Sequence, residues 1–317
     1  MKTVGLPISK KENENRRALI PAHLANIKNA DMLYFEKGYG EVLGYSDEEY
    51  TKYGAHIASR EEVLQKDIIC DAKIGDADYL DQLKDQTIFG WVHLVQNRDI
   101  TDAVLNGKLT AYTWEDMHDE GRHSFWHNNE MAGEAAIMHA FQCYGEMPYN
   151  TKVAMTGRGN VASGALRILT CLGADVTVYN RRTEKLLRRE LEQYNVIVNA
   201  LLWDTSRRDH IIYREDLKRL QPNALIIDIS CDRAGAIETC IPTTIEEPTY
   251  VVDGVMHYAV DHTPSLFYKT ATKGISEQVS MYLDQLIEDK PGKVLMDALA
   301  VKDGVILDQR IKDFQGR

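Results

Sequence analysis

The clearest hydrophobic pattern lies in the middle of the chain, where short apolar runs alternate with helix-compatible polar stretches. Buried strands that alternate with helices are typical of a parallel sheet covered by helices. We therefore predict an α/β fold with a Rossmann-type, doubly wound parallel sheet. Its strands are expected at "KVAMTG" (152–157), "ADVTVYN" (174–180), "NVIVNALLW" (195–203), "NALIIDIS" (223–230) and "TYVVDGV" (249–255).

The two ends of the chain carry a second pattern. The first 130 residues mix short apolar runs with helices, and the last 45 read as helical around "ISEQVSMYLDQLIED". We expect a second α/β domain in which the C-terminal helices return to the first part. The expected segments are a substrate domain at 1–133, a dinucleotide domain at 134–268 and returning helices at 269–317. The stretch "NNEMAGEAAIMHAFQCYG" is expected to be a bridging helix.

Composition narrows the range of partners. The 317 residues are 44% hydrophobic and carry a net charge of −11 without a basic block, which disfavours nucleic acid and anionic membranes. The N-terminus lacks the apolar core of a signal peptide, so we expect a cytoplasmic protein. Five cysteines without CxxC spacing are interpreted as buried thiols, and we expect no metal site.

A glycine-rich turn follows the first predicted strand of the dinucleotide domain. Gly157, Gly159 and Ala162 form G-x-G-x-x-A between that strand and an amphipathic helix. The first glycine permits a tight turn, the second lets a pyrophosphate approach the backbone, and the small third residue allows close packing of helix on strand. The helix N-terminus adds unpaired N–H groups. We expect the cofactor to bind Gly157, Arg158, Gly159, Asn160, Val161 and Ala162.

The end of the second predicted strand decides which dinucleotide fits. An acid that bonds the ribose hydroxyls is expected there for NAD, but the chain has Asn180, Arg181 and Arg182. Paired guanidiniums suit the 2′-phosphate of NADP(H), because they form charge-assisted bonds to a phosphate. The alternative is that Arg181 and Arg182 belong to an ordinary solvated turn.

Candidate chemical groups lie in the N-terminal part. Arg16 and Arg17 stand in "NENRRALIP", Lys73 in "CDAKIG" and His93 in "GWVHLVQNRD". Taken singly, each residue is more often structural than catalytic. Together they offer cations for a carboxylate and an imidazole for proton transfer.

Long strings resemble the superfamily of alanine dehydrogenase, transhydrogenase and lysine-forming saccharopine dehydrogenase. They include "NENRRALIP", "AKIGD", "EMAGEAA", "GRGNVASGA" and "VVDGVMHY". Within it, "KTVGLPISKKENENRRALIP", "FEKGYGEVLGY" and "IFGWVHLVQNRDITD" resemble the carboxyethylornithine synthases. This resemblance implies condensation of pyruvate with the side-chain amine of ornithine, or of lysine, and reduction with NADPH. It also implies an interrupted catalytic domain, and we expect a homo-oligomer.

The resemblance assigns roles residue by residue. It makes Arg16 the clamp of the keto-acid carboxylate, with Arg17 as the competitor, Lys73 a second substrate contact and His93 the catalytic histidine. Asp232 matches a catalytic aspartate, although the residues that follow it differ from the alanine dehydrogenase pattern. Arg122, in the saccharopine-like "GRHSFW", is expected to bind a second carboxylate.

Some assignments stay open. Glu115, Asp116 and Glu130 are candidates for holding the amino-acid substrate, with solvated or capping roles as the alternative. His262 stands where alanine dehydrogenases carry asparagine, which disfavours that activity. The competing functions are an alanine dehydrogenase and a non-enzymatic NADP(H)-binding subunit comparable with a transhydrogenase component.

Overall fold

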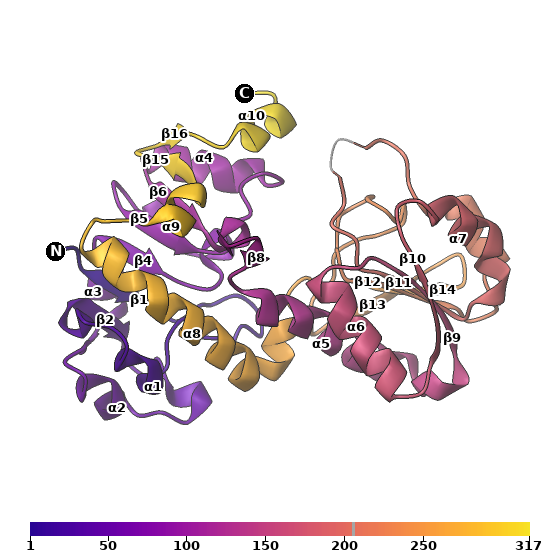
Figure 1. Cartoon of the computed structure of the whole chain (residues 1–317), viewed down its shortest axis with the longest axis horizontal. Coiled ribbons are helices and arrows are strands. Elements are labelled where there is room, and N and C mark those ends of the chain that lie inside the picture. The colour runs from indigo at the N-terminus through magenta and orange to yellow at the C-terminus, as the bar shows by residue number, and fades with distance from the viewer. Residues whose placement is uncertain (205–206) are drawn as a thin grey trace. The chain divides into compact units, whose positions relative to one another are not determined.

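The computed structural model describes residues 1–204 and 207–317. The chain divides into two compact units: unit 1 comprises 1–126 and 268–317, and unit 2 comprises 127–267. Unit 1 therefore joins the two ends of the chain, and Figure 1 shows gold and yellow C-terminal elements among the indigo and purple N-terminal ones. The prediction of a second α/β domain built from both ends is confirmed.

Unit 1 contains an eight-stranded sheet. Six neighbouring strands are parallel, and the two C-terminal strands add to its edge in antiparallel fashion. In sheet order the strands are β16 (Val305–Ile306), β15 (Leu299–Lys302), β6 (Thr110–Thr113), β5 (Thr87–Gly90), β4 (Ile68–Cys70), β1 (Val4–Leu6), β2 (Leu33–Glu36) and β3 (His56–Ala58). A separate short hairpin joins β7 (His118–Asp119) to β8 (Arg122–His123).

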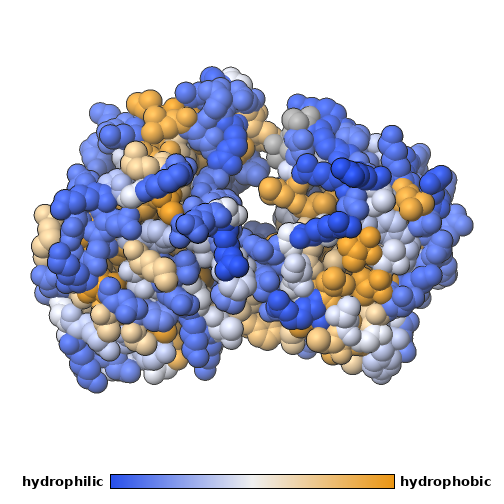
Figure 2. Space-filling view, in the orientation of Figure 1, coloured by the Kyte–Doolittle hydropathy of each residue, from blue (hydrophilic) through white to orange (hydrophobic). Residues whose placement is uncertain are grey.

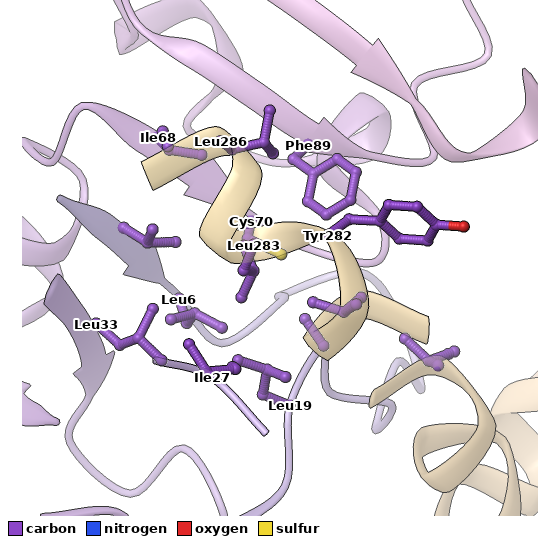
Figure 3. Close-up of a cluster of buried hydrophobic side chains, with 14 of the residues drawn as sticks. Leu6, Leu19, Ile27, Leu33, Ile68, Cys70, Phe89, Tyr282, Leu283 and Leu286 are labelled. Atoms are coloured by element: carbon purple, nitrogen blue, oxygen red, sulfur yellow. The ribbon is translucent and has the colours of Figure 1, made fainter. Parts of the chain in front are cut away.

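Helix α8 (Tyr268–Ile287) completes the core of unit 1. Its buried face, which includes Ile275, Val279 and Leu283, packs with residues of β1, β2 and β4 in one hydrophobic cluster. Figure 3 shows Leu283 beside Cys70 and Leu286 beside Phe89, within the cluster that also holds Leu6. The remaining helices of unit 1 are α1 (Pro21–Leu24), α2 (Asp47–Thr51), α3 (Arg60–Val63), α4 (Arg98–Asn106), α9 (Lys293–Asp297) and α10 (Gln309–Gln315).

Unit 2 contains a six-stranded sheet that is parallel except for one edge strand. Its order is β10 (Asp175–Tyr179), β9 (Lys152–Thr156), β11 (Val196–Asn199), β12 (Leu225–Asp228), β14 (Val255–Tyr258) and β13 (Thr249–Val252). The helices of this part are α5 (Trp126–Tyr144), α6 (Asn160–Cys171) and α7 (Glu184–Glu190). The predicted Rossmann-type sheet is confirmed, and the predicted bridging helix corresponds to α5.

Two predictions need correction in unit 2. The run 249–255 is not one strand, because Asp253 and Gly254 adopt φ values of 48° and 84° and turn the chain into the antiparallel β13–β14 hairpin. An Asp-Gly pair between apolar runs favours this turn, since both central positions need positive φ. The expectation that every cysteine is buried is also wrong, because Cys171 is exposed at the end of α6.

The viewed face of each unit in Figure 2 is largely hydrophilic, with scattered apolar residues. No helix in the described ranges is both long and apolar enough to cross a membrane.

Candidate active site

The loops after four parallel strands of unit 1 carry the candidate catalytic residues. Arg16 follows β1, Lys73 follows β4, His93 follows β5 and Glu115 follows β6. Since the carboxyl ends of parallel strands meet at one edge of a sheet, these loops share that edge. The Gly75 amide donates to the Trp91 carbonyl at 3.1 Å and joins the loop of Lys73 to the loop of His93.

Arg16 is buried and held by a carboxylate that sequence reasoning did not single out. Glu14 accepts the Arg16 backbone amide at 2.9 Å and its Nε at 2.8 Å, and its other oxygen accepts the terminal nitrogen Nη2 at 2.5 Å. Burial by itself raises the pKa of Glu14, but the charges of Arg16 and Lys73 lower it below its ordinary value. The guanidinium also lies 5.3 Å from the centre of the Trp91 ring. The Arg16 fork is therefore fixed in one orientation.

Arg17, the competitor for the carboxylate clamp, has a structural environment. Its Nε donates to the Tyr39 carbonyl at 2.7 Å, and a terminal nitrogen donates to the Arg16 carbonyl at 2.9 Å. Its backbone amide donates to Thr272 at 3.1 Å. These contacts tie the loop to the core of unit 1.

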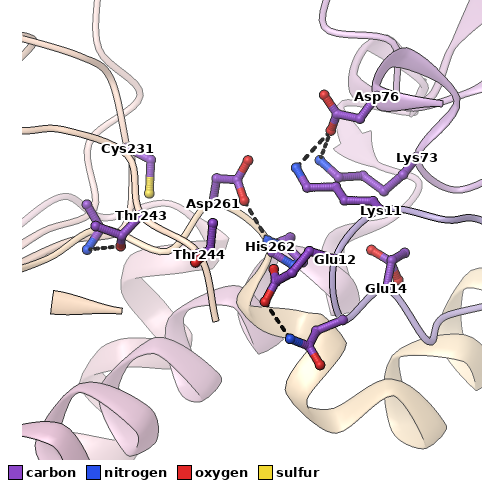
Figure 4. A network of polar contacts seen from close by, with 12 residues as sticks. Lys11, Glu12, Glu14, Lys73, Asp76, Cys231, Thr243, Thr244, Asp261 and His262 are labelled. Carbon is purple, nitrogen blue, oxygen red and sulfur yellow. Dashed lines mark hydrogen bonds and ion pairs between the residues drawn. The ribbon is translucent and has the colours of Figure 1, made fainter. Parts of the chain in front are cut away.

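Lys73 is buried beside a second lysine and a shared carboxylate (Figure 4). The Lys73 and Lys11 ammonium groups lie 3.0 and 2.9 Å from the same Asp76 oxygen. Burial opposes ionisation of Asp76, but the two ammonium groups hold its pKa at about 2. The Lys73 amide donates to Asp71 at 3.1 Å, so the turn after β4 is also closed by a carboxylate.

His93 stands in a strained turn held by Glu115. Its φ is 56°, a left-handed conformation that costs free energy in a residue other than glycine. Glu115 accepts the His93 amide at 2.5 Å and the Val92 amide at 3.3 Å, and Asn97 donates to the His93 carbonyl at 2.9 Å. Desolvation raises the pKa of Glu115 to about 7 despite these hydrogen bonds. The structure thus gives Glu115 a backbone-holding role.

Arg122 is exposed on the β7–β8 hairpin, and its guanidinium lies 5.1 Å from the centre of the Trp126 ring. No contact in the described residues joins it to Arg16, Lys73 or His93. The hairpin itself is anchored by His123, whose Nε2 lies 3.2 Å from the Glu115 carbonyl oxygen. Asp116 pairs with Arg310 at 2.8 Å in unit 1, and Glu130 pairs with Arg167 at 3.0 Å in unit 2. A set of aromatic side chains, Trp91, Trp114 and Phe125, packs in the core of unit 1.

In unit 2 the glycine-rich turn connects β9 to α6. Gly157 has a φ of 113°, and a Cβ there would lie 2.5 Å from the Ala200 carbonyl oxygen, so no other residue fits. Gly159 is the N-cap of α6, and a Cβ added to it would meet nothing within 4 Å. Ala162 is buried, whereas Arg158 is exposed. This open helix N-terminus has the form that binds the pyrophosphate of a dinucleotide.

The turn after β10 presents two arginines. The Asn180 side chain accepts the Arg182 amide at 2.8 Å, and the Asn180 amide donates to Thr183 at 2.9 Å. Arg181 and Arg182 are exposed, and within the described ranges neither pairs with a carboxylate. A cavity of about 50 Å³ beside this turn is lined by Arg181, Leu201, Leu202, Trp203, Asp204 and Arg207.

Asp232 lies in the loop that follows β12. Burial and the neighbouring Asp228 raise its pKa to about 7. The Gly235 amide donates to the Asp232 carbonyl at 2.9 Å and closes a turn. A perturbed carboxyl in a loop at the carboxyl edge of such a sheet is typical of a functional residue.

Sequence reasoning missed Glu14 and Asp71. Each stands two residues before a cation that it holds, Arg16 or Lys73. An acid two residues before a cation in a loop after a strand is a signal that points to such a turn, although it does not reveal burial.

Two family models match the chain: "Alanine dehydrogenase/PNT, N-terminal domain" over 5–135 and "Alanine dehydrogenase/PNT, C-terminal domain" over 181–311. An N(5)-(carboxyethyl)ornithine synthase of Clostridium botulinum is 34% identical over 88% of this chain and 93% of its own. A synthase of that name from Lactococcus lactis is 29% identical over 87% of this chain and 94% of its own. An alanine dehydrogenase of Methanococcus maripaludis is 27% identical over 89% of this chain and 87% of its own.

A solved structure of L-alanine dehydrogenase has the same fold. Its TM-score is 0.83 with 19% identity over 99% of both chains. The sequence relation to the C. botulinum synthase and the two matched domains establish a common family. The chain thus belongs to the alanine dehydrogenase/PNT superfamily and, within it, to the family of the N(5)-(carboxyethyl)ornithine synthases.

Proposed function

We propose that this chain is an NADPH-dependent oxidoreductase that joins pyruvate to the side-chain amine of ornithine or lysine and yields a carboxyethyl amino acid. Its relation to the carboxyethylornithine synthases supports this reading. The observation that carries it is the Glu14-held Arg16 fork, which shares a sheet edge with the loops of Lys73 and His93.

The residues of unit 2 fit a nicotinamide dinucleotide. The Gly157 turn and the free N-terminus of α6 suit its pyrophosphate, and Arg181 with Arg182 suits a 2′-phosphate. When bound, the reduced nicotinamide supplies the hydride that an imine needs to become an amine.

Arg16 and Lys73 suit pyruvate. Glu14 binds Nε and Nη2 of Arg16, so the orientation of the guanidinium is set before the substrate arrives, and its positive charge is proposed to attract the keto-acid carboxylate. Lys73 provides an ammonium group that polarises the keto oxygen or gives the carboxylate a second contact. Arg122 is proposed to bind the α-carboxylate of the amino acid, because its exposed guanidinium is positioned by Trp126.

His93 is proposed to move protons during condensation. The amine attacks the keto carbon only after its ammonium form loses a proton, and the resulting hydroxyl leaves as water only after it gains one. An imidazole can accept the first proton and return it to the hydroxyl. Only about one side-chain amine in a thousand is neutral at pH 7, so this transfer matters to the rate.

The test combines NADPH consumption with product mass. Pyruvate is supplied with ornithine, lysine or ammonia as the amine. We expect oxidation of NADPH with a diamine and a product that carries one carboxyethyl group. Alanine from ammonia as the sole product would replace this proposal with an alanine dehydrogenase, the activity named for other relatives of this chain. NADPH binding without turnover would indicate a non-enzymatic subunit.

A further inference from the structure

Three polar side chains form a buried row across the carboxyl ends of neighbouring strands in unit 2. Thr156 ends β9, Asn199 ends β11 and Asp228 ends β12, and the sheet register pairs Asn199 with both other residues. Thr156 Oγ1 donates to Asn199 Oδ1 at 2.8 Å, and Asn199 Nδ2 donates to Asp228 Oδ1 at 2.9 Å. The three residues are 3%, 1% and 2% exposed.

Apolar side chains would fill these positions without the cost of removing polar groups from water. A hydrogen-bonded row adds direction, because each bond weakens steeply when the strand ends shift. It therefore fixes the three strand ends more tightly than packing of apolar groups would.

Each end of the row leads into a candidate functional segment. Thr156 immediately precedes Gly157. Asn199 immediately precedes Ala200, and the Ala200 carbonyl leaves no space for a Cβ at Gly157. At the other end, Asp228 Oδ1 also accepts the amide of Cys231 at 3.2 Å. Cys231 has a φ of 56° and directly precedes Asp232, so the accepted hydrogen bond holds a strained turn.

One carboxyl oxygen of Asp228 is buried without a hydrogen bond in the part of the chain that the structure describes. This atom is Oδ2, and the residue as a whole is almost fully buried. A buried carboxyl left partly unsatisfied costs stability. At this position Asp228 accepts the Cys231 amide and so holds the start of the Asp232 loop.

We propose that Thr156, Asn199 and Asp228 act as one positioning row that fixes the Gly157 turn and the Asp232 loop relative to each other, with Asp228 as the positioning residue for Asp232. The part that concerns Asp232 rests on the proposed function. The coupling between the Gly157 turn and the Asp232 loop does not depend on the proposed function.

Hydrogen exchange of the whole protein, measured by mass spectrometry without substrate, tests the row. Thr156→Val removes the hydroxyl at one end, and the peptide that covers 229–236 lies at the other end. We expect exchange in that peptide to increase about 3- to 10-fold, as for the loss of one hydrogen bond. Thr156→Ser keeps the hydroxyl and should restore the wild-type rate.

Thr151→Val is the matched control, because Thr151 is buried directly before the other end of the same strand and donates to the Pro148 carbonyl at 2.8 Å. Equal exchange of 229–236 in Thr156→Val and Thr151→Val would overturn the proposal. In the reverse direction, Asp228→Ala should accelerate exchange at 157–162 and weaken NADPH binding about 3- to 10-fold. If that variant does not fold, the Thr156 comparison decides alone.

Turnover and hydrogen exchange are separate measurements, so failure of the proposed function can be distinguished from failure of the positioning row. Absence of turnover in the wild-type protein with pyruvate and a diamine would refute the function and leave the exchange result unaffected. If turnover is present, Asp228→Asn keeps the accepting oxygen and removes the negative charge beside Asp232. We expect a shift in the pH profile of kcat with little change in exchange at 229–236. An unchanged profile would remove Asp228 as a positioning residue for Asp232.

Discussion

At the scale of single residues, a carboxyl group holds the backbone of three candidate residues in unit 1. Glu14 accepts the amide of Arg16, Asp71 that of Lys73, and Glu115 that of His93. Each carboxyl group is an acceptor in the turn that it closes, so these loops are held before substrate arrives. The candidate side chains are thereby preorganised for binding and proton transfer.

The sequence points to the two cations and the histidine as candidates, but it does not reveal the carboxyl groups that hold their backbones. Lys73 and His93 stand at the ends of apolar runs and Arg16 follows a short polar run, which is visible along the chain. That Glu14 is buried against Arg16 depends on packing by distant segments and is not visible there. The contact of Arg17 with the Tyr39 carbonyl, 22 residues away in the sequence, is likewise not visible along the chain.

The paired arginines after β10 lead to a prediction about cofactor choice. Replacing Arg181 and Arg182 by glutamine should reduce the preference for NADPH over NADH at least about tenfold, since two charge-assisted contacts are lost. The ratio of kcat/KM for the two cofactors measures this. Arg189→Gln, on the exposed side of α7, is the control and should leave the ratio unchanged. An unaltered ratio in the double variant would assign these arginines to a solvated turn.

A second residue-scale prediction concerns His93. We expect His93→Ala to lower kcat by roughly a hundredfold, the usual loss when general acid–base help is removed. The dissociation constant of NADPH, followed by fluorescence, should stay the same because the glycine-rich turn that is proposed to bind the cofactor lies in unit 2. His56→Ala serves as the control, since His56 is exposed on β3. Turnover at the wild-type level would mean that another group transfers the proton.

At the scale of elements, strands with strong apolar character were predicted and short connections were not. β9, β10, β11 and β12 lie within predicted runs. The run 249–255 predicts one strand because apolar residues stand on both sides of its Asp-Gly pair, whereas the structure turns there into the β13–β14 hairpin. The β7–β8 hairpin is exposed and charged, so no alternation of apolar residues marks it.

The loop after β5 gives a prediction about pH. The pKa of Glu115 is raised to about 7, so between about pH 4.5 and 7 the folded protein keeps a proton that the unfolded chain has released. The free energy of unfolding must therefore decline across this window as pH rises, and level off above it. Glu115→Gln removes the titrating group and should therefore reduce this decline. The expected reduction is on the order of 1 kcal/mol, which is less than the full pKa shift would give, because solvent reaches part of the residue and screens its charge.

Urea unfolding at pH 5 and pH 7.5 measures the change. Glu61→Gln is the control, because Glu61 lies on the surface in α3 and its pKa is lowered by hydrogen bonds at the helix N-terminus. The same pH dependence in Glu115→Gln and wild type would show that Glu115 does not titrate in this range.

At the scale of the whole molecule, unit 1 depends on contacts between the two ends of the chain. Leu283 of α8 is fully buried in the cluster that includes Leu6 of β1. Leu283→Ala should lower the free energy of unfolding by about 2 to 5 kcal/mol, through lost burial and the cavity left behind. Met281→Ala, on the exposed side of the same helix, should change it by less than about 0.5 kcal/mol.

Denaturant unfolding followed by tryptophan fluorescence distinguishes the two variants. Similar small effects at both positions would mean that α8 contributes little to the stability of unit 1.

The division of unit 1 between the chain ends also has a consequence for folding during synthesis. Residues 127–267 leave the ribosome as a continuous segment, whereas residues 1–126 must wait for α8 before their core closes. Contacts between distant segments form slowly, and incomplete domains expose apolar surface in the meantime. We expect a released chain that ends at residue 267 to contain a protease-resistant unit 2 beside an N-terminal segment that is still cleaved. Demand for chaperones should accordingly fall only when the last 50 residues have been made.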